Sequence, residues 1–386
     1  MKRITTIITT IILTFIIAQK VNANTNYVGP SGSPGGNYFT DIQSAVDATL
    51  VGGLVLVSNG VYNTGETITP YGELTNRVVV LTNITIRSIG GPQSTIIVGG
   101  EGINGDQGTG AVRCVYMEAG ILSGFTLSNG CTLITAQTPN DKSGGGFFLL
   151  YAYDGMVSNC VIINCKGGEK EGNDGGGGGS CISGGNIDDC VFLKNEANFG
   201  GGIYIIAGEI RNSSIINNYS GYTGGGICQE GGELFNCIIS GNYAENYGGG
   251  INGYDGTIKN CQIVNNSVTN SSDGFGGGIH CFRNMFVVNC SIISNSAYYG
   301  GGIQCHSVGG NYFSNCVVSA NNVAGGGGGV DFGNNSEMLN CLIKNNSATN
   351  RGGGVFSAGG TLRNCTVVSN YSNNGGGIYC DGTHPT

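Results

Sequence analysis

Charged side chains that could do chemistry are gathered in two short segments of a chain that has few charges. Charged residues make up 10% of the 386 residues, yet segments 131–143 and 165–175 together hold Lys142, Lys166, Glu169, Lys170 and Glu171. A lysine with acids beside it can act as the base of a polysaccharide lyase or bind an acidic sugar. A polar surface loop without a chemical role is the alternative interpretation.

Aromatic residues form a second candidate site. They recur in the short segments that precede clusters of glycine, as Phe199, Tyr219, Tyr222, Tyr243, Tyr247, Phe275, Tyr298, Tyr299 and Tyr371. Rings repeated at about 5 Å along one edge can stack on sugars or on a partner protein. Mutual packing of the rings, which would close a bend of the chain, is the alternative.

Other catalytic and metal-binding patterns are missing from the sequence. Asp188-Asp189 is the only pair of adjacent carboxylates in the chain, and a solvated turn explains it better than an acid/base pair. No Cys-x-x-Cys occurs, and His280, His306 and His384 do not combine with cysteines at zinc-site spacing. The sequence therefore predicts no metal and no cofactor, and it leaves open whether the protein is an enzyme.

A repeat must position these candidates. Its first mark is a cysteine, usually 23 to 26 residues after the previous one, with Ser213 replacing it once; the cysteines are Cys160, Cys190, Cys237, Cys261, Cys290, Cys316, Cys341 and Cys365. An asparagine follows each mark by five residues except after Cys160, giving Asn195, Asn218, Asn242, Asn266, Asn295, Asn321, Asn346 and Asn370. Glycines and an aliphatic residue close each copy. Such a period predicts a solenoid.

The short segments between the marks are β-branched and alternate in polarity, as in Ile303-Gln-Cys305, which predicts strands. About 24 residues per repeat suit a coil of three short strands and three bends, so we expect an all-β parallel β-helix. Like side chains on successive coils then stack about 4.8 Å apart. We expect the asparagines to adopt the left-handed conformation at a bend and to bond the next coil, and the glycines to allow close backbone approach.

The 16 cysteines are expected to be free thiols that act as small buried hydrophobes. Cysteines stacked on successive coils would hold their Cβ atoms about 4.8 Å apart, beyond the 3.5–4.5 Å that a disulfide prefers. In an exported protein disulfides are otherwise the usual expectation.

The chain divides into three parts. Residues 1–23 resemble a signal peptide, because Lys2 and Arg3 precede an apolar run that ends before Val21-Asn22-Ala23. Residues 24–119 would form an N-terminal cap and irregular first coils, with a short helix over 40–50 that begins at the capping box Thr40-Asp-Ile-Gln43. Residues 120–386 would form the regular coils, with no cap recognisable at their C-terminal end.

Export makes a secreted or surface location the expectation, with a membrane anchor as the alternative, although the apolar run is shorter than the roughly 20 residues that a spanning helix needs. Cleavage would leave 13 basic against 24 acidic residues, a net charge of −11, and no transmembrane segment. That charge argues against nucleic acid or anionic lipid as a partner. With 74 glycines in clusters and 6 prolines, the chain is neither collagen nor a proline-rich disordered protein.

The segment NYVGPSGSPGGNYFTDIQSAVDATLVGGLVLVSNGVYN resembles the opening of secreted bacterial right-handed parallel β-helix proteins with the pectin-lyase-like fold. The repeats, such as Phe192-Leu-Lys-Asn195, are similar to those of chlamydial polymorphic outer membrane proteins, which implies a surface-exposed module. The catalytic aspartates of polygalacturonase-like hydrolases and the arginine and calcium-binding acids of pectate lyases have no counterpart. We therefore expect a surface or extracellular binding or adhesion module for polysaccharide or for a host or cell-surface protein. A polysaccharide lyase or glycoside hydrolase is the alternative.

Overall fold

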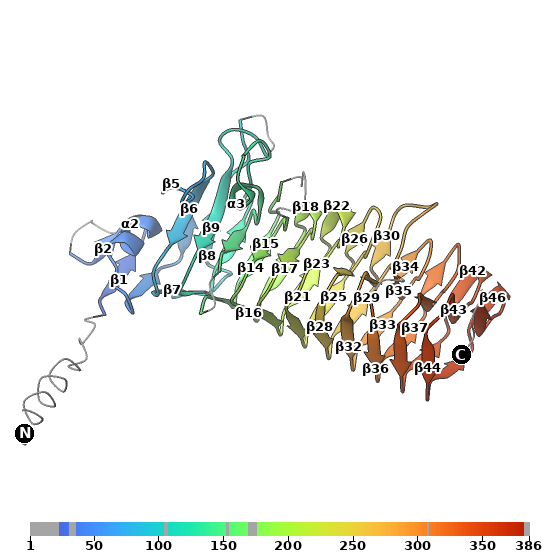
Figure 1. Ribbon diagram of the computed structural model, residues 1–386. Helices are drawn as coiled ribbons and strands as arrows, with labels where there is room; N and C mark the ends of the chain where they lie inside the picture. Colours follow the sequence, from blue (N-terminus) through green and yellow to red (C-terminus); the bar gives the residue numbers. More distant parts are fainter. Residues whose placement is uncertain are drawn as a thin grey trace, which may run out of the picture.

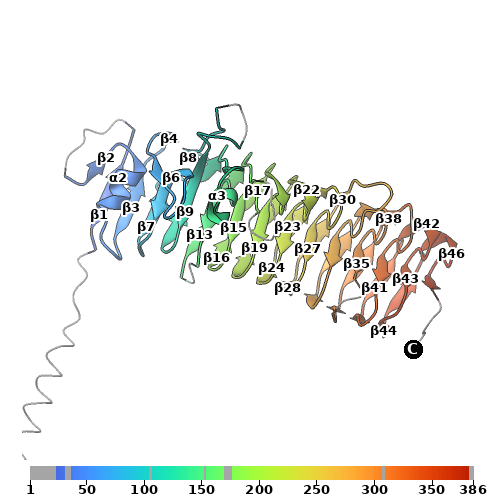
Figure 2. The same ribbon diagram turned by 45° about the horizontal axis from the view of Figure 1, so that its top comes forward.

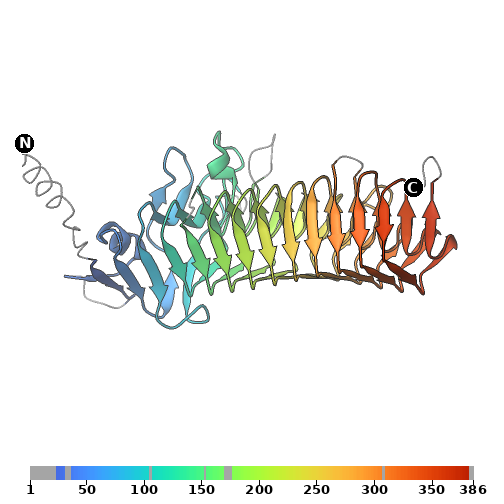
Figure 3. The ribbon, with the colours of Figure 1, turned by 60° about the horizontal axis from the view of Figure 1, so that its bottom comes forward.

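The chain folds as a right-handed parallel β-helix, which confirms the predicted fold. The computed structural model describes residues 23–30, 36–103, 107–151, 154–168, 176–306 and 309–381. Coils follow one another along a single axis from the N-terminal to the C-terminal part (Figure 1, Figure 3). Among the described strands every pairing is parallel except that of β5 with β6. The predicted signal peptide lies outside the described residues, apart from Ala23.

The strands form four sheets, which we call A to D. Sheet A contains β2 (Tyr38–Phe39), β1 (Thr25–Val28), β3 (Leu54–Val57), β7 (Thr85–Ser88), β10 (Ile121–Ser123), β13 (Met156–Ser158), β16 (Asn186–Asp188), β20 (Glu209–Arg211), β24 (Glu233–Phe235), β28 (Gly256–Lys259), β32 (Met285–Val288), β36 (Tyr312–Ser314), β40 (Glu337–Leu339) and β44 (Thr361–Arg363). Sheet B contains β4 (Gly60–Tyr62), β8 (Thr95–Val98), β11 (Thr126–Ser128), β14 (Val161–Ile163), β17 (Val191–Leu193), β21 (Ser214–Ile216), β25 (Ile238–Ser240), β29 (Gln262–Val264), β33 (Ser291–Ile293), β37 (Val317–Ser319), β41 (Leu342–Lys344) and β45 (Thr366–Val368).

Sheet C contains β5 (Thr67–Ile68), β6 (Thr75–Val80), β9 (Val112–Met117), β12 (Phe147–Leu149), β15 (Ser180–Ile182), β19 (Ile203–Ile205), β23 (Ile227–Gln229), β27 (Ile251–Gly253), β31 (Ile279–Cys281), β35 (Ile303–Cys305), β39 (Val330–Phe332), β43 (Val355–Ser357) and β47 (Ile378–Cys380). Sheet D contains β18 (Glu196–Phe199), β22 (Tyr219–Thr223), β26 (Tyr243–Ala244), β30 (Ser267–Val268), β34 (Ser296–Ala297), β38 (Asn322–Val323), β42 (Ser347–Arg351) and β46 (Tyr371–Asn374).

Sheet D corrects the expectation of three strands per coil. It begins at β18 and adds a fourth short strand between sheets B and C in each later coil. The reason is local, because the chain stays extended after each stacked asparagine and pairs there with the neighbouring coil, as Tyr219 does with Tyr243.

The predicted N-terminal helix is present but shorter. Helix α2 spans Ile42–Asp47 and lies at the N-terminal end of the stack (Figure 2). Its N-cap is Asp41, whose carboxylate accepts a hydrogen bond from the Ser44 backbone N–H at 2.8 Å, so the predicted box at Thr40 and Gln43 is wrong by one residue. The Gln43 side chain bonds the backbone of Val79 in sheet C instead, which ties the helix to the first coils.

Stacked asparagines link successive coils. The Asn218 Oδ1 atom accepts from the backbone N–H of Asn195 at 2.9 Å and from its Nδ2 at 3.0 Å. The Asn218 Nδ2 group in turn donates to the Phe192 carbonyl at 3.1 Å. The same contacts recur from coil to coil as far as Asn370. All of these side chains except the half-buried Asn370 are buried, so they satisfy backbone groups that water cannot reach.

From the sequence we expected the stacked asparagine to take the left-handed conformation. The structure shows that the residue before it does so instead. Lys194 and Asn217 have φ angles of 55° and 54°. Asn236, which precedes Cys237, has a φ of 54° as well. The chain turns at this earlier position, and the following side chain can then point along the axis to the next coil.

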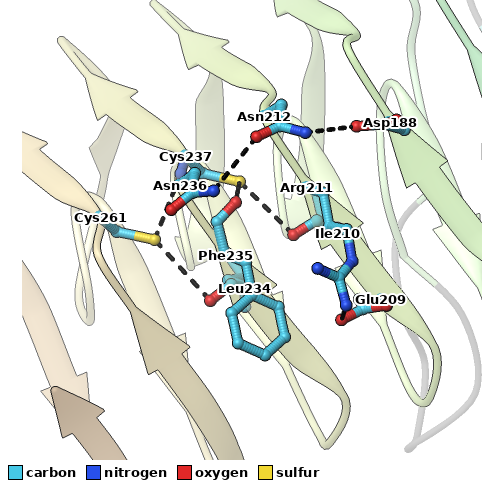
Figure 4. Close-up of polar contacts among 10 residues, drawn as sticks. All are labelled: Asp188, Glu209, Ile210, Arg211, Asn212, Leu234, Phe235, Asn236, Cys237 and Cys261. Atoms are coloured by element: carbon cyan, nitrogen blue, oxygen red, sulfur yellow. Dashed lines mark hydrogen bonds and ion pairs between the residues drawn. The ribbon is translucent and has the colours of Figure 1, made fainter.

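The stacked cysteines occupy an equivalent place at the preceding bend. The backbone N–H of Cys237 donates to the Cys261 Sγ at 3.4 Å, and the Cys237 thiol approaches the carbonyl oxygens of Ile210 and Phe235 at 3.6 and 3.2 Å (Figure 4). On the outside of this bend the Asn236 amide donates to Asn212, whose own amide donates to Asp188. The sulfur thus takes the acceptor role that Oδ1 takes in the asparagine stack, and Ser213 takes it through its hydroxyl oxygen at 3.1 Å.

Glycine is required where the backbones of successive coils touch. Gly224 has a φ of +68°, which L side chains rarely adopt. A Cβ atom on the next residue, Gly225, would lie 2.4 Å from the carbonyl oxygens of both Gly249 and Tyr243. The glycine clusters therefore reflect coil-to-coil distance and need no functional explanation.

Thiol labelling is the first testable consequence. None of the sixteen cysteines is in a disulfide; fourteen of them are buried, Cys365 is half-buried and Cys380 is exposed. We expect a thiol reagent to label Cys380 quickly and Cys365 slowly in the native protein, because a buried thiol is not accessible. In denaturant without reductant it should label all sixteen. A count well below sixteen in intact mass spectrometry would reveal disulfides and contradict this description.

Candidate functional site

The first inserted segment folds against the first coils and is not a free loop. It contains helix α3 (Pro139–Lys142), in which Lys142 is half-buried at the last position. The carboxylate of Asp141 is fully buried and accepts from the backbone N–H groups of Glu73 and Leu74 at 2.7 and 3.1 Å. Arg113, also buried, donates to the carbonyl oxygens of Ser143 and Gly144. The segment therefore serves the packing of the N-terminal coils.

The second segment contributes one described lysine. Lys166 Nζ lies 2.8 Å from Glu101 Oε1, and this hydrogen bond raises the pKa of the lysine. Glu169, Lys170 and Glu171 lie outside the described residues. A lysine with a raised pKa keeps its proton at neutral pH, so the Lys166 seen here does not suit the role of a lyase base.

Lys166 and Tyr219 border one hollow of about 390 Å³ on the outer face of sheet D. The sequence placed these two residues in separate candidate sites. Glu196 and Glu245 line the same hollow, and the Tyr219 hydroxyl donates to Glu245 at 2.8 Å. Burial and this hydrogen bond raise the pKa of Tyr219 to about 12. With Glu101 balancing the lysine, the surroundings are acidic and do not favour an acidic sugar.

The aromatic residues do not form the single row that we expected from the sequence. One row, which we call the first ridge, consists of Phe199, Tyr222, Tyr247, Phe275 and Tyr299, with ring centroids 5.5, 5.8, 5.8 and 5.3 Å apart. Tyr298 packs edge-on against Tyr299 at 4.7 Å. Tyr219 and Tyr243 form a separate pair at 4.8 Å on the outer face of sheet D. The described tyrosines therefore divide between two surfaces.

The first ridge borders the outer face of sheet C, which is unusual for its burial. The middle residues of adjacent strands on this face are Tyr204, Cys228, Asn252 and His280, and their exposed fractions are 2, 1, 1 and 5%. On sheets A and B most of the outward side chains are half-buried or exposed. Residues outside the strands of sheet C must therefore cover its outer face.

A second ridge lies on the other side of that face. It consists of Tyr254, Phe282 and His306, with ring centroids 5.2 and 4.9 Å apart. Between the two ridges is a hollow of about 220 Å³, and a neighbouring hollow of about 420 Å³ shares Tyr254 and Phe282 with it. We call the two ridges and the sheet C residues between them the groove.

The floor of the groove offers polar groups. His280 Nδ1 lies 2.5 Å from Asn252 Oδ1, and because an amide oxygen only accepts, Nδ1 donates and Nε2 keeps its lone pair. Burial, with a smaller effect of His306, lowers the pKa of His280 to about 3, so the ring is neutral at physiological pH. On the next strand Gln304 Oε1 is buried without a partner among the described residues. His280 lines the hollow between the ridges, so its Nε2 can accept a hydrogen bond from a ligand hydroxyl.

Asp331 continues the same column of side chains, next to Gln304. Burial raises the pKa of its carboxyl to about 7. The folded protein thus holds a proton that the unfolded chain, with a pKa of about 3.9, releases. Stability is therefore lost as the pH rises from about 4 to about 7 and stays lower above that range.

We expect this loss to be about 2 kcal/mol, allowing for partial solvent access to the carboxyl. The variant Asp331→Asn should lack it and should exceed the natural protein in stability at pH 8 but not at pH 4. Urea unfolding at the two pH values measures the difference. Parallel pH curves for the two proteins would show that Asp331 titrates normally.

No protein-family model matches the chain, and no curated protein matches it. Among solved structures, the A-module of a mannuronan C-5 epimerase of Azotobacter vinelandii is 13% identical with a TM-score of 0.44, covering 92% of this chain and 100% of that one. A rhamnogalacturonan lyase is 13% identical with a TM-score of 0.37, covering 84% and 82%. A surface adhesin of Streptococcus pneumoniae is 10% identical with a TM-score of 0.34, covering 82% and 83%.

The likeness of these three structures to this chain is weak. At these identities the likeness concerns the fold alone, and the strand pairing of the β-helix establishes the fold independently. Within the described ranges, no group of three His, Cys, Asp or Glu side chains could hold a metal ion. No helix in the described part of the chain is long and apolar enough to cross a membrane.

Sequence reasoning missed the floor and the second ridge. Tyr204, Cys228, Asn252, His280 and Gln304 all follow the aliphatic residue that closes a repeat, yet their types differ from coil to coil. That variation was the available signal, because a position that only stacks on its own kind should repeat.

Proposed function

We propose that the protein is an extracellular binding module whose groove on sheet C binds an uncharged polysaccharide. The observation that carries the proposal is the pair of aromatic ridges on either side of a polar floor. Sugar rings have apolar faces that stack on aromatic rings, and hydroxyl groups at their edges that need hydrogen-bond partners. Rings repeated about 5 Å apart suit a ligand that is itself a repeating chain.

The charges of the protein support the proposal that its ligand is uncharged. The chain carries a net charge of −8. In the groove, Arg283 pairs with Asp255 at 2.9 Å, and the Tyr204 hydroxyl donates to Glu230 at 3.1 Å. Lys166, the described lysine of segment 165–175, is balanced by Glu101. An acidic polysaccharide would meet a negative field without a free cation in these places. The surface or secreted location rests on the leader sequence and stays a prediction.

Two ridge variants test the proposal. A glycan array first identifies neutral polysaccharides that bind, and calorimetry then measures Tyr247→Ala and Phe282→Ala. Each change removes one stacking ring, and we expect binding to weaken about tenfold, equivalent to about 1.4 kcal/mol. Tyr371→Ala is the matched control, since this ring is 66% exposed and lies outside the groove. Unchanged binding in both ridge variants, or an equal loss in the control, would place the site elsewhere.

A polysaccharide-cleaving enzyme is the second candidate, favoured by the neutral His280 ring and by the raised pKa of Asp331 in the same column. If cleavage occurs, incubation with the bound polysaccharide should produce new unsaturated or reducing ends. His280→Gln should then abolish turnover while most of the binding survives. Binding without any new chain ends would leave the binding module as the function.

A further inference from the structure

The outer face of sheet B differs from the outer face of sheet A in charge. The two outward residues of each sheet B strand from β8 to β45 comprise thirteen aliphatic residues, seven serines or threonines, Gln262 and Lys344. The equivalent outward positions of sheet A from β7 to β44 include eight charged residues. We call the outward residues of β8 to β45 the sheet B face.

This face is exposed and continuous. Most of its side chains are half-buried, and Ile238 and Val368 are 41% and 46% exposed. The strands lie side by side in one row (Figure 1). Eleven strands about 4.8 Å apart, each about 10 Å long, make a face of about 500 Å². The largest apolar patch on a soluble protein is typically about 300–600 Å² and is often an interaction surface, and the sheet B face has this size.

We propose that the sheet B face binds a second copy of this chain, face to face around a twofold axis. The near absence of charge on this face favours a second copy. Two chains that each have a net charge of −8 repel each other least where neither presents charge. The equal coil spacing also matches between copies, so rows of side chains on one can fit between rows on the other. The groove lies on sheet C, so this proposal is independent of polysaccharide binding.

The area of the sheet B face limits the affinity of the dimer. Two faces of about 500 Å² bury about 1,000 Å² in total, the lower limit for a specific interface. The dimer should therefore be reversible, with a Kd of about 1 to 100 µM. In a twofold pairing residues near the axis meet their own copies. The middle strand of the eleven is β25, so Ile238 of one copy lies near Ile238 of the other.

Analytical ultracentrifugation of the purified chain from about 1 to 200 µM tests the association. The natural protein should shift from monomer to dimer. Ile238→Lys places two like charges together at the axis and should weaken the dimer at least about tenfold. Phe286→Lys is the matched control, because this residue is 50% exposed on the outer face of sheet A and its replacement should leave the dimer unchanged.

A mixture of Ile238→Lys and Ile238→Glu proteins should recover the dimer, because opposite charges then meet at the axis. A merely structural effect of either substitution would not be rescued in this way. A natural protein that stays monomeric at 200 µM overturns the proposal. A dimer that tolerates Ile238→Lys as well as Phe286→Lys, or a mixture that stays monomeric, overturns it also.

Discussion

Replacement of Asn321 by alanine is expected to lower the free energy of unfolding by about 3 to 5 kcal/mol. The Asn321 Nδ2 group donates to the Ile292 carbonyl and to Asn346 Oδ1, both at 3.0 Å. Its Oδ1 accepts from the backbone N–H of Asn295 at 2.8 Å. The side chain is 1% exposed, so water cannot replace these bonds without opening the coil. The truncation removes four buried hydrogen bonds and leaves the backbone N–H of Asn295 without its acceptor.

The neighbouring residue offers a matched control. Asn322 is exposed, and its replacement by alanine should change stability by no more than about 0.5 kcal/mol. Guanidinium unfolding measured by circular dichroism compares the two variants. Because a solenoid can unfold in parts, hydrogen exchange should show that the loss is centred on the coils that contain Asn295, Asn321 and Asn346. Equal stability of the two variants would mean that the stacked asparagines contribute little.

Replacement of Arg113 by methionine is expected to destabilise the N-terminal coils by about 3 to 5 kcal/mol. The guanidinium is fully buried and donates to Asn76 Oδ1 at 2.9 Å and to the carbonyl oxygens of Ser143 and Gly144 at 2.8 and 2.9 Å. Burial lowers its pKa to about 10, which still leaves it charged at neutral pH. Its removal deprives the buried carboxylate of Asp141 of a favourable charge.

Arg363→Met is the control for Arg113→Met. Arg363 pairs with Glu337 at 3.1 Å, but 67% of its side chain is exposed, so its loss should cost less than about 1 kcal/mol. Thermal unfolding of the two variants, with proteolysis of segment 131–143 as a local probe, makes the comparison. An equal effect of the two substitutions would contradict the anchoring role of Arg113.

The sequence by itself was sufficient to predict the parallel β-helix, although not its fourth sheet. The cysteine and asparagine columns, the glycine clusters and the alternating strands predicted a parallel β-helix with free thiols. The physical reason is stacking, because each coil presents the same environment to the next and a stacked position such as Asn242 therefore repeats as Asn218 and Asn266. The repeat could not show which residue of a bend takes the left-handed conformation, because Asn217 and Asn218 are adjacent residues of the same type.

Only the tertiary structure decided the candidate site. It separated Tyr219 from Tyr247 and paired Lys166 with Glu101, which lies 65 residues earlier. It also placed His280 between Tyr247 and Phe282 on the groove. Side chains that line the groove come from different bends, and their neighbours depend on how far each bend projects from its coil. The residue type at a stacked position is determined by the same position in the neighbouring coil. A groove is formed by bends, and the repeat does not require these bends to have the same sequence or length in each coil.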